Sequence, residues 1–424
     1  MELAKGQLGR CILLILFILC GVILISASQL SLSSILKAYA RSLTLSSSCI
    51  TYNAAARVIT VTCGSATLTD IYNHIHGDSV LVRQSVDGVW LLSADLVVSK
   101  GAVLRIDSGD TKWLRISSDA TGTGSSTTTP YNIDVHGSLK IDSVKITSWN
   151  TLTNNYATTN GTRQDLGVGK SESTVPGAPR PFIIVEKDAT GPTDITNSEI
   201  AYLGYEKGSF TGSGTSGLNY YGADGSILKG NDIHNLYFGF YSSGVGRFVI
   251  ENNQIHDNTI YGLDPHTRTH DTIIRNNVVH DNGQFGIICS LNCNNITIEN
   301  NEVYHNSDKN TGAGIMFSRN MVNSVARNNN IHDEPAAAIS ISASQNNQIY
   351  NNTISNSGDG INVKNSSNNR IHNNTVINSA SGINTDRNSG SGNTIYNNQF
   401  VNTPSSSSTT NDQKHEKLKS RHHK

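Results

Sequence analysis

From residue 233 to residue 400 the chain repeats a short polar-apolar phrase, Asn-Asn-x-Ile or a close variant, at nearly constant intervals. Its closing apolar residues are Ile233, Ile255, Val279, Val303, Ile331, Ile354, Val376 and Phe400, which lie 22, 24, 24, 28, 23, 22 and 24 residues apart. A period of this size indicates stacked supersecondary units rather than a compact globular domain.

An alternating apolar-polar stretch follows a glycine six or seven residues after most copies of the phrase. Examples are GFYSS at 239, GLDPH at 262, GIICS at 286, GINVK at 360 and GINTD at 382, while AAAISIS replaces the glycine after Ile331. Alternation of β-branched with polar residues is the strand period, and no segment of the repeat has a sustained helical stripe. We therefore expect short strands separated by sharp turns.

Leucine-rich repeats share this period, but they need several spaced leucines per unit, and this region uses Ile and Val instead. The pattern favours an all-β fold, a right-handed parallel β-helix in which each coil adds strands to stacked sheets. Asparagine suits the sharp corners because it tolerates the left-handed backbone, and stacked asparagine side chains can hydrogen-bond from coil to coil.

We expect this solenoid to cover residues 80–402, with Gly/Ser/Thr-rich loops at 119–130 and 208–217. Residues 29–79 are interpreted as a lead-in and an N-terminal capping helix. Leu68, Ile71 and Ile75 have helical spacing there, Thr67 or Thr69 is the expected N-cap, and Gly77 is the expected stop. Such a helix would cover the open edge of the first coil.

The two ends differ from the body in composition. Lys5 and Arg10 precede the apolar run CILLILFILCGVILI at 11–25, so residues 1–28 are interpreted as a signal peptide or a membrane anchor, which implies an extracytoplasmic body. Residues 403–424 are rich in Ser and Thr with a basic end, and we expect them to be disordered.

The cysteines outside the apolar run form two close pairs. Cys49 and Cys63 suit a disulfide in an oxidising compartment, whereas Cys289 and Cys293 suit either a disulfide or small core residues. Their spacing lacks a zinc signature, so no metal site is expected.

Charge and aromatic content limit the partners of the chain. The net charge is −1 and aromatic residues make up 6%. Nucleic acid is therefore not an expected partner, and any acidic polymer would have to be attracted by a local groove. We expect a monomer.

The stretch YGLDPHTRTH, residues 261–270, departs from the repeat. Strand alternation places Leu263 and Pro265 inward, so Asp264 and His266 are expected to project together into solvent, with Tyr241 in the same outward column. His234, His256, His280 and His332, in contrast, recur at one phase of the repeat, which indicates a structural role.

A carboxyl, an imidazole and a phenol on the path of a polymer suit proton transfer. A uronic acid polymer carries a C5 proton beside a carboxylate, and its abstraction builds charge that a cation or neutral acid must stabilise. Return of the proton from the opposite face is epimerisation, and loss of the C4 oxygen is lyase chemistry.

The stretch Tyr261-Gly262-Leu263-Asp264-Pro265-His266 with Arg268 resembles the signature of the mannuronan (alginate) C-5-epimerases of the periplasmic single-domain type. ITSWN near 146, RPFIIVE at 180, AYLGY at 201, LYFGFYSS at 236 and FGIICS at 285 extend the resemblance over roughly residues 80–400. The resemblance implies an isomerase in which His266 is the C5 base, Tyr261 the proton donor and Asp264 a supporting residue; the exchanged assignment of Tyr261 and His266 stays open.

One departure from that family concerns the arginine that neutralises the substrate carboxylate, because Leu291 occupies its place. Arg319, at the same phase one coil later, or Arg268 could supply the charge, and Tyr241 and Lys229 are further candidate substrate-binding residues. No cofactor is expected, and calcium is not indicated because the calcium-binding nonapeptide repeats of secreted epimerases are missing from the sequence.

Three function classes remain at this point. The first is a polysaccharide C-5-epimerase that converts β-D-mannuronate to α-L-guluronate, or acts on an analogous uronan. The second is a uronan lyase or hydrolase, and the third is a noncatalytic carbohydrate-binding envelope scaffold.

Overall fold

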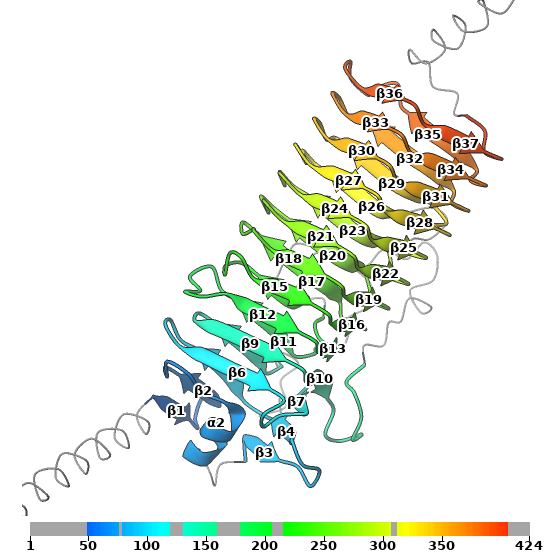
Figure 1. Cartoon of the computed structure of the whole chain (residues 1–424). Coiled ribbons are helices and arrows are strands. Elements are labelled where there is room, and N and C mark those ends of the chain that lie inside the picture. Colours follow the sequence, from blue (N-terminus) through cyan, green and yellow to red (C-terminus); the bar gives the residue numbers. More distant parts are fainter. Residues whose placement is uncertain are drawn as a thin grey trace, which may run out of the picture. The chain divides into compact units, whose positions relative to one another are not determined.

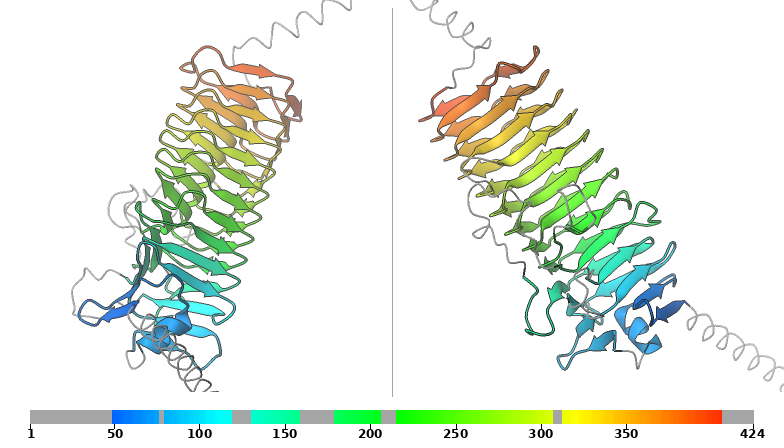
Figure 2. Two further views of the ribbon diagram at one scale, coloured as in Figure 1. Left: turned by 60° about the vertical axis from the view of Figure 1, so that its left-hand side comes forward. Right: turned by 180° about the vertical axis from the view of Figure 1, so that it is seen from behind.

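The computed structural model describes residues 49–75, 79–118, 130–158, 179–205, 215–306 and 312–405. The described residues from Thr51 onward form one compact unit, in which successive coils stack along a common axis (Figure 1). Three long sheets line this stack, as two further views show (Figure 2). Almost every strand pairs in parallel with strands of the neighbouring coils. The predicted parallel β-helix is therefore confirmed.

Sheet A has thirteen strands: β1 (Ile50–Asn53), β2 (Val58–Val61), β5 (Asp95–Val98), β8 (Asn132–Val135), β11 (Phe182–Val185), β14 (Gly217–Tyr220), β17 (Phe238–Ser243), β20 (Tyr261–His266), β23 (Phe285–Ser290), β26 (Ala313–Ser318), β29 (Ala337–Ser342), β32 (Asp359–Lys364) and β35 (Ser381–Thr385).

Sheet B has eleven strands: β6 (Val103–Asp107), β9 (Ser138–Asp142), β12 (Thr193–Thr196), β15 (Ile227–Lys229), β18 (Val249–Glu251), β21 (Ile273–Arg275), β24 (Thr297–Glu299), β27 (Val325–Arg327), β30 (Gln348–Tyr350), β33 (Arg370–His372) and β36 (Thr394–Tyr396).

Sheet C has thirteen strands: β3 (Leu81–Arg83), β4 (Val89–Leu92), β7 (Trp113–Ser117), β10 (Lys145–Trp149), β13 (Glu199–Ala201), β16 (Asp232–His234), β19 (Gln254–His256), β22 (Val278–His280), β25 (Glu302–Tyr304), β28 (Asn330–His332), β31 (Thr353–Ser355), β34 (Thr375–Ile377) and β37 (Gln399–Val401). The pair β3–β4 is antiparallel.

The two asparagines of the repeated phrase have separate roles. The first takes the left-handed backbone at the corner between sheets B and C, as Asn252 and Asn276 do with φ of 57° and 55°. The second donates its amide to the next asparagine at 2.9–3.0 Å and is buried in every copy but the last, in the series Asn253, Asn277, Asn301, Asn329, Asn352, Asn374 and Asn398. Both predicted roles are confirmed, and the ladder satisfies polar groups that burial would otherwise leave without partners.

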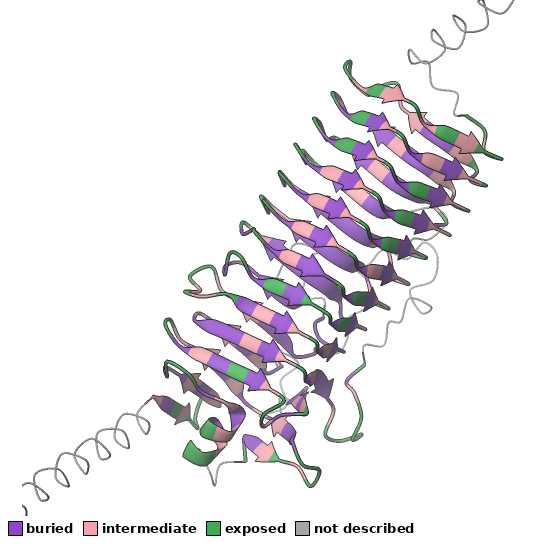
Figure 3. Ribbon diagram, viewed as in Figure 1, coloured by how far each residue is buried: buried purple, intermediate pink, exposed green. Residues whose placement is uncertain are grey.

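The core runs through the middle of the coils (Figure 3). Burial alternates along many strands, whereas β17, β20 and β23 are buried over most of their length. The residues after the repeated glycine form an inward column as predicted, each at most 3% exposed: Phe240, Leu263, Ile287, Ile315, Ile361 and Ile383. Burial of such columns is the main stabilising term in a solenoid, because each coil covers only its neighbours.

The recurring histidines form a ring ladder on sheet C, as their constant phase predicts. The rings of His234 and His256 stack at 5.0 Å, those of His256 and His280 at 4.9 Å, and Tyr304 continues the stack at 4.8 Å from His280. These histidines are therefore part of the coil architecture.

The solenoid begins earlier than residue 80, which corrects the predicted domain boundary. Strand β2 already pairs in parallel with β5, because Ile59 and Val61 alternate into the core. The helix α2 (Leu68–His74) lies between β2 and β5 in the sequence, and its N-cap, Thr67, forms a capping box with Asp70. That α2 covers the first coil stays a prediction, and the expected stop at Gly77 lies outside the described residues.

Several predicted segments also lie outside the described residues: the apolar run at 11–25, most of the loops at 119–130 and 208–217, and residues 406–424 of the tail. Within the part of the chain that the structure describes, no helix has the length and apolarity needed to cross a membrane. Cys49 and Cys63 are both disulfide-bonded, as expected.

Candidate active site

Strand β20 begins with Tyr261, and the next position, Gly262, faces into the coil. A Cβ on Gly262 would lie 2.6 Å from the Gly286 carbonyl oxygen and 3.0 Å from Val279 Cγ1, so this position faces into the coil. Leu263, the next residue, is also fully buried in the core. Two consecutive inward positions leave Tyr261 on the outer face together with Asp264 and His266.

These three side chains line a groove on the outer face of sheet A, with a volume of ≈ 360 Å³. Strand β17 supplies the neighbouring column, in which Tyr241 lies opposite Asp264. On the other side, β23 and β26 contribute the remaining wall, and Leu291 and Arg319 directly follow these two strands. The odd stretch of the sequence therefore forms the centre of a groove that four adjacent coils build.

Asp264 is only 2% exposed, which corrects the expectation that it projects into solvent. Its Oδ1 atom is buried and has no hydrogen-bond partner among the described residues. Burial raises the pKa of this carboxyl well above its usual range, and the positive charge of Arg319 opposes the shift only in part. The acid form of Asp264 is therefore favoured over a wider pH range than that of an exposed aspartate.

His266 is half-buried at the end of β20. Its Nδ1 lies 2.8 Å from the Thr267 hydroxyl and 3.4 Å from the Tyr241 hydroxyl. Burial and the charge of Arg319 lower its pKa to about 4, so the imidazole is neutral at neutral pH. In the tautomer that donates from Nδ1 to Thr267, the Nε2 lone pair is available to accept a proton.

The predicted cationic residues differ in whether they line the groove. Arg319 lines the groove, and its charge acts on both Asp264 and His266. Arg268 is exposed in the turn after β20 and is not among the residues that line the groove. Lys229 lies on β15 in sheet B, where it forms an ion pair with Glu251 at 2.9 Å. Lys229 is therefore not among the described residues that line the groove, because its strand belongs to another sheet.

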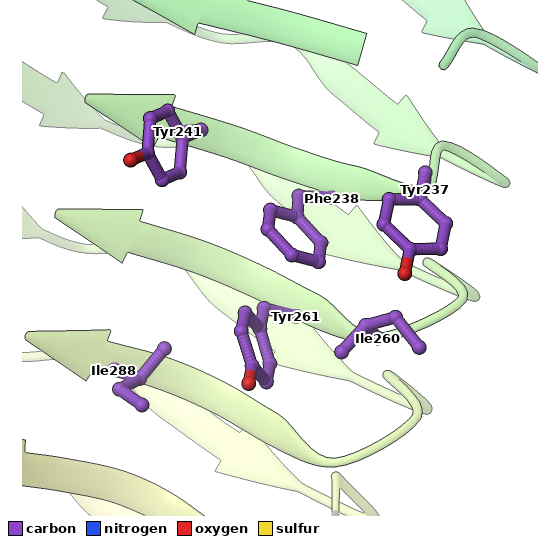
Figure 4. Packing of buried hydrophobic residues seen from close by; sticks show 6 residues of the cluster. All are labelled: Tyr237, Phe238, Tyr241, Ile260, Tyr261 and Ile288. Atoms are coloured by element: carbon purple, nitrogen blue, oxygen red, sulfur yellow. The ribbon is translucent and has the colours of Figure 1, made fainter. Parts of the chain in front are cut away.

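An aromatic cluster forms one wall of the groove (Figure 4). The rings of Phe238 and Tyr261 are 4.7 Å apart, and Phe285 continues the contact at 5.4 Å from Tyr261. Tyr241 packs 5.5 Å from the His266 ring. Burial raises the pKa of Tyr241, so its hydroxyl keeps its proton at neutral pH.

The pair Cys289 and Cys293 lies beneath the groove as free, buried thiols. The Cys293 thiol donates to the Ser290 carbonyl at 3.0 Å. Of the two readings that the sequence left open, the small core residue is the one found. Among the described residues, no cluster of three or more His, Cys, Asp or Glu side chains could hold a metal ion.

Thr267 is a further candidate site residue, which the sequence interpretation did not include. Its hydroxyl is the nearest partner of His266 Nδ1, and its φ of 24° is unusual for a β-branched residue. Backbone strain of this kind concentrates at functional sites. Its place directly after His266, inside the one stretch that breaks the repeat, was the available signal.

Comparison with known proteins places these features in a wider context. The family model described as "Right handed beta helix region" matches residues 171–321, and the model described as "Periplasmic copper-binding protein (NosD)" matches residues 288–420. Both matches cover less than half of the chain. The first agrees with the coils described above.

Two curated relatives are mannuronan C5-epimerases from Pseudomonas species. The Pseudomonas putida protein is 29% identical over 289 residues, which is 66% of this chain and 50% of the relative. The Pseudomonas syringae pv. tomato protein is 26% identical over 276 residues, or 63% of this chain and 46% of the relative. The chain thus spans about half the length of the curated relatives it matches.

Among solved structures, the crystal structure of the periplasmic alginate epimerase AlgG superposes with a TM-score of 0.68 at 21% identity, over 81% of this chain and 85% of that one. The A-module of the Azotobacter vinelandii mannuronan C-5 epimerase AlgE4 superposes with a TM-score of 0.53 at 15% identity, over 76% and 87%. At these identities the likeness concerns the fold. The resemblance of this chain to the mannuronan C5-epimerase family of right-handed parallel β-helix proteins is confirmed.

Proposed function

We propose that this chain is a polysaccharide C-5-epimerase, an isomerase that inverts uronate residues within a polymer. The observation that carries the proposal is the meeting of three groups in one groove: the neutral imidazole of His266, the buried and unpartnered carboxyl of Asp264, and the positive charge of Arg319. Proton abstraction beside a carboxylate needs a base, a proton donor and a cation, and this groove contains all three.

In the proposed reaction His266 takes the C5 proton of a bound uronate. The electron pair of the C–H bond moves into the carboxylate, which becomes an enediolate. Arg319 and the acid proton of Asp264 stabilise the added charge, because a fixed charge and a hydrogen-bond donor act more strongly in a groove of low dielectric than in bulk water. A proton then returns to C5 from the opposite face of the ring, and the C–H bond forms again with inverted configuration.

The proposed proton donor is the Tyr261 hydroxyl, which comes from the opposite end of β20 in the same groove. A tyrosine hydroxyl is a donor at neutral pH, since its unperturbed pKa is about 10. The exchanged roles of Tyr261 and His266 are less well supported, because a neutral imidazole accepts a proton much more readily than a protonated phenol does.

The experiment that tests this proposal is incubation with mannuronan in deuterated water. An epimerase is expected to place deuterium at C5 of guluronate residues without cleaving the chain. Unsaturated chain ends that absorb in the ultraviolet would instead indicate a lyase, and binding without either change would indicate a scaffold.

The charge of Arg319 gives a specific expectation. Replacing Arg319 by Gln removes the cation that faces Asp264 and His266, and is expected to lower kcat/KM by about 10²-fold, as loss of one stabilising group does at comparable sites. Arg268→Gln is the matched control and is expected to have little effect, since Arg268 is exposed outside the groove. Equal losses in the two variants would contradict the assignment of Arg319.

The acidic limb of the pH profile should report His266. Only the neutral imidazole accepts a proton, so kcat/KM is expected to fall as the pH drops through about 4 rather than through 6.5. Folding stability also falls as the pH drops from 6.5 to 4, because the unfolded chain binds this proton more tightly than the folded protein does. Circular dichroism at each pH would separate titration from unfolding, and a fall centred near 6.5 in folded protein would contradict the assignment.

We also propose an extracytoplasmic location for the body of the protein. The apolar run at 11–25, the two disulfide-bonded cysteines and the periplasmic relatives support it. Residues 1–28 are proposed to be either a cleaved signal peptide or a membrane anchor. We further propose that the protein is a monomer, that its partner is an acidic polysaccharide, and that the α2 helix covers the first coil. Fractionation of cells that express the full chain would test the location.

A further inference from the structure

Among the residues that the structure describes, the lining of the groove carries less positive charge than a fully charged uronan would require. Most of its wall is aromatic or aliphatic: Phe238, Tyr241, Tyr261, Phe285, Ile288 and Met316. Gln284, Ser290 and Ser318 are its uncharged polar members. Arg319 is the one arginine or lysine among the described residues that line the groove, so that lining can neutralise a single carboxylate.

The free energy of burying a second carboxylate decides what can lie beside the first. A polymer made only of uronates brings a negative charge with every sugar. Next to Phe238 and Ile288, which line the groove, such a charge would lie against apolar side chains without gaining a cation. A carboxylate that leaves water without a charged or hydrogen-bonding partner is strongly disfavoured. A neutral sugar in the same place carries no such cost.

The arrangement of the aromatic wall suits a neutral neighbour. Phe238 and Tyr241 lie on β17 and Tyr261 on the next strand β20 (Figure 4). Phe285 follows on β23, so the rings continue from coil to coil beside the reacting position. Large, rigid aromatic side chains pack against the C–H face of a sugar ring and place hydroxyls at its edge. An apolar wall of this extent attracts uncharged sugar faces rather than carboxylates.

We propose that the substrate is a heteropolymer in which the reacting uronate is flanked by neutral sugars, rather than a chain of consecutive uronates. This inference rests on the proposed epimerase function and specifies its substrate class. Arg319 binds the one carboxylate that the reaction uses, and the aromatic wall holds the uncharged residue beside it.

The test uses two polymers that share linkage and configuration and differ only in flanking charge. One is mannuronan, and the other is mannuronan in which about half of the carboxyl groups are reduced to mannose. Deuterium incorporation at C5 is measured for both and divided by the number of uronates. We expect kcat/KM per uronate to be at least about tenfold higher for the reduced polymer, the effect of about 1.4 kcal/mol.

A charge added to the groove should reverse this preference. Gln284 lines the groove and is half-buried, so Gln284→Arg introduces a second cation there without filling the core. The ratio between the two polymers is expected to fall towards one. The matched control is Gln254→Arg, an exposed position on β19 of sheet C, which adds the same charge elsewhere and should leave the ratio unchanged.

The possible outcomes separate this inference from the function on which it rests. Equal rates on both polymers, or a preference for unmodified mannuronan, would overturn the inference and leave the epimerase proposal intact. Absence of C5 deuterium in both polymers, with folding verified by circular dichroism, would overturn the epimerase proposal itself. A polymer preference that Gln284→Arg and Gln254→Arg change equally would show that net charge, and not the groove, sets it.

Discussion

Replacement of His266 by alanine is expected to lower C5 epimerisation by about 10²–10⁴-fold, the contribution of a general base. The imidazole lies in the groove, its pKa of about 4 keeps it neutral, and Thr267 orients its Nδ1 side. The fold should persist, because His266 is outside the core columns. Measurement of deuterium at C5 under single-turnover conditions would isolate the chemical step.

His280→Ala is the matched control for this substitution. His280 stacks between His256 and Tyr304 at 4.9 and 4.8 Å on sheet C, away from sheet A. Its removal is expected to change thermal stability slightly and turnover hardly at all. Near-normal turnover of His266→Ala, on a substrate that the wild-type protein epimerises, would rule out His266 as the base.

The second large effect is expected at Asp264, where charge and hydrogen bonding can be separated. Asp264→Ala removes the proton donor and is expected to cost about 10²–10³-fold, as loss of one donor to a developing oxyanion does. Asp264→Asn keeps a neutral N–H donor of similar size, so it should retain most of the activity. If the ionised carboxylate were needed instead, Asp264→Asn would be as slow as Asp264→Ala.

The alkaline side of the pH profile provides an independent check of this role. The raised pKa of Asp264 means that its acid form persists above the usual range and is lost as the pH rises through the folded value. Activity should therefore decline on the alkaline side in the wild-type protein. That decline should be missing in Asp264→Asn, because an amide does not titrate there, whereas an unchanged alkaline limb would assign the titration to another group.

The stacking of coils was predictable from residues 233–400 because each copy of the phrase repeats the same local requirements. Asn252 must take a corner, Asn253 must find an amide partner one coil away, and Ile255 must enter the core. Each requirement has its own sequence signal, since corner geometry, amide pairing and burial favour different residue types. The start of the solenoid at β2 was missed because that coil lacks the asparagine phrase.

The candidate site was predictable only in part. Strand alternation correctly placed Asp264 and His266 on one face. Alternation gives the direction of a side chain, but it does not show whether side chains of neighbouring coils bury it. Asp264 is buried because Tyr241 and other groove residues come from neighbouring coils, 20 or more residues away in the sequence. For a related reason the sequence did not show that Lys229 lies on sheet B, since a basic residue does not reveal which of three sheets it occupies.

The most direct test of the account is proton NMR of mannuronan and its half carboxyl-reduced form after incubation in deuterated water with the wild-type protein and with His266→Ala. The expected result is deuterium at C5 of inverted residues, an intact chain length, greater exchange per uronate in the reduced polymer, and almost no exchange with His266→Ala. Unsaturated chain ends in place of C5 deuterium, or equal exchange with and without His266, would contradict it.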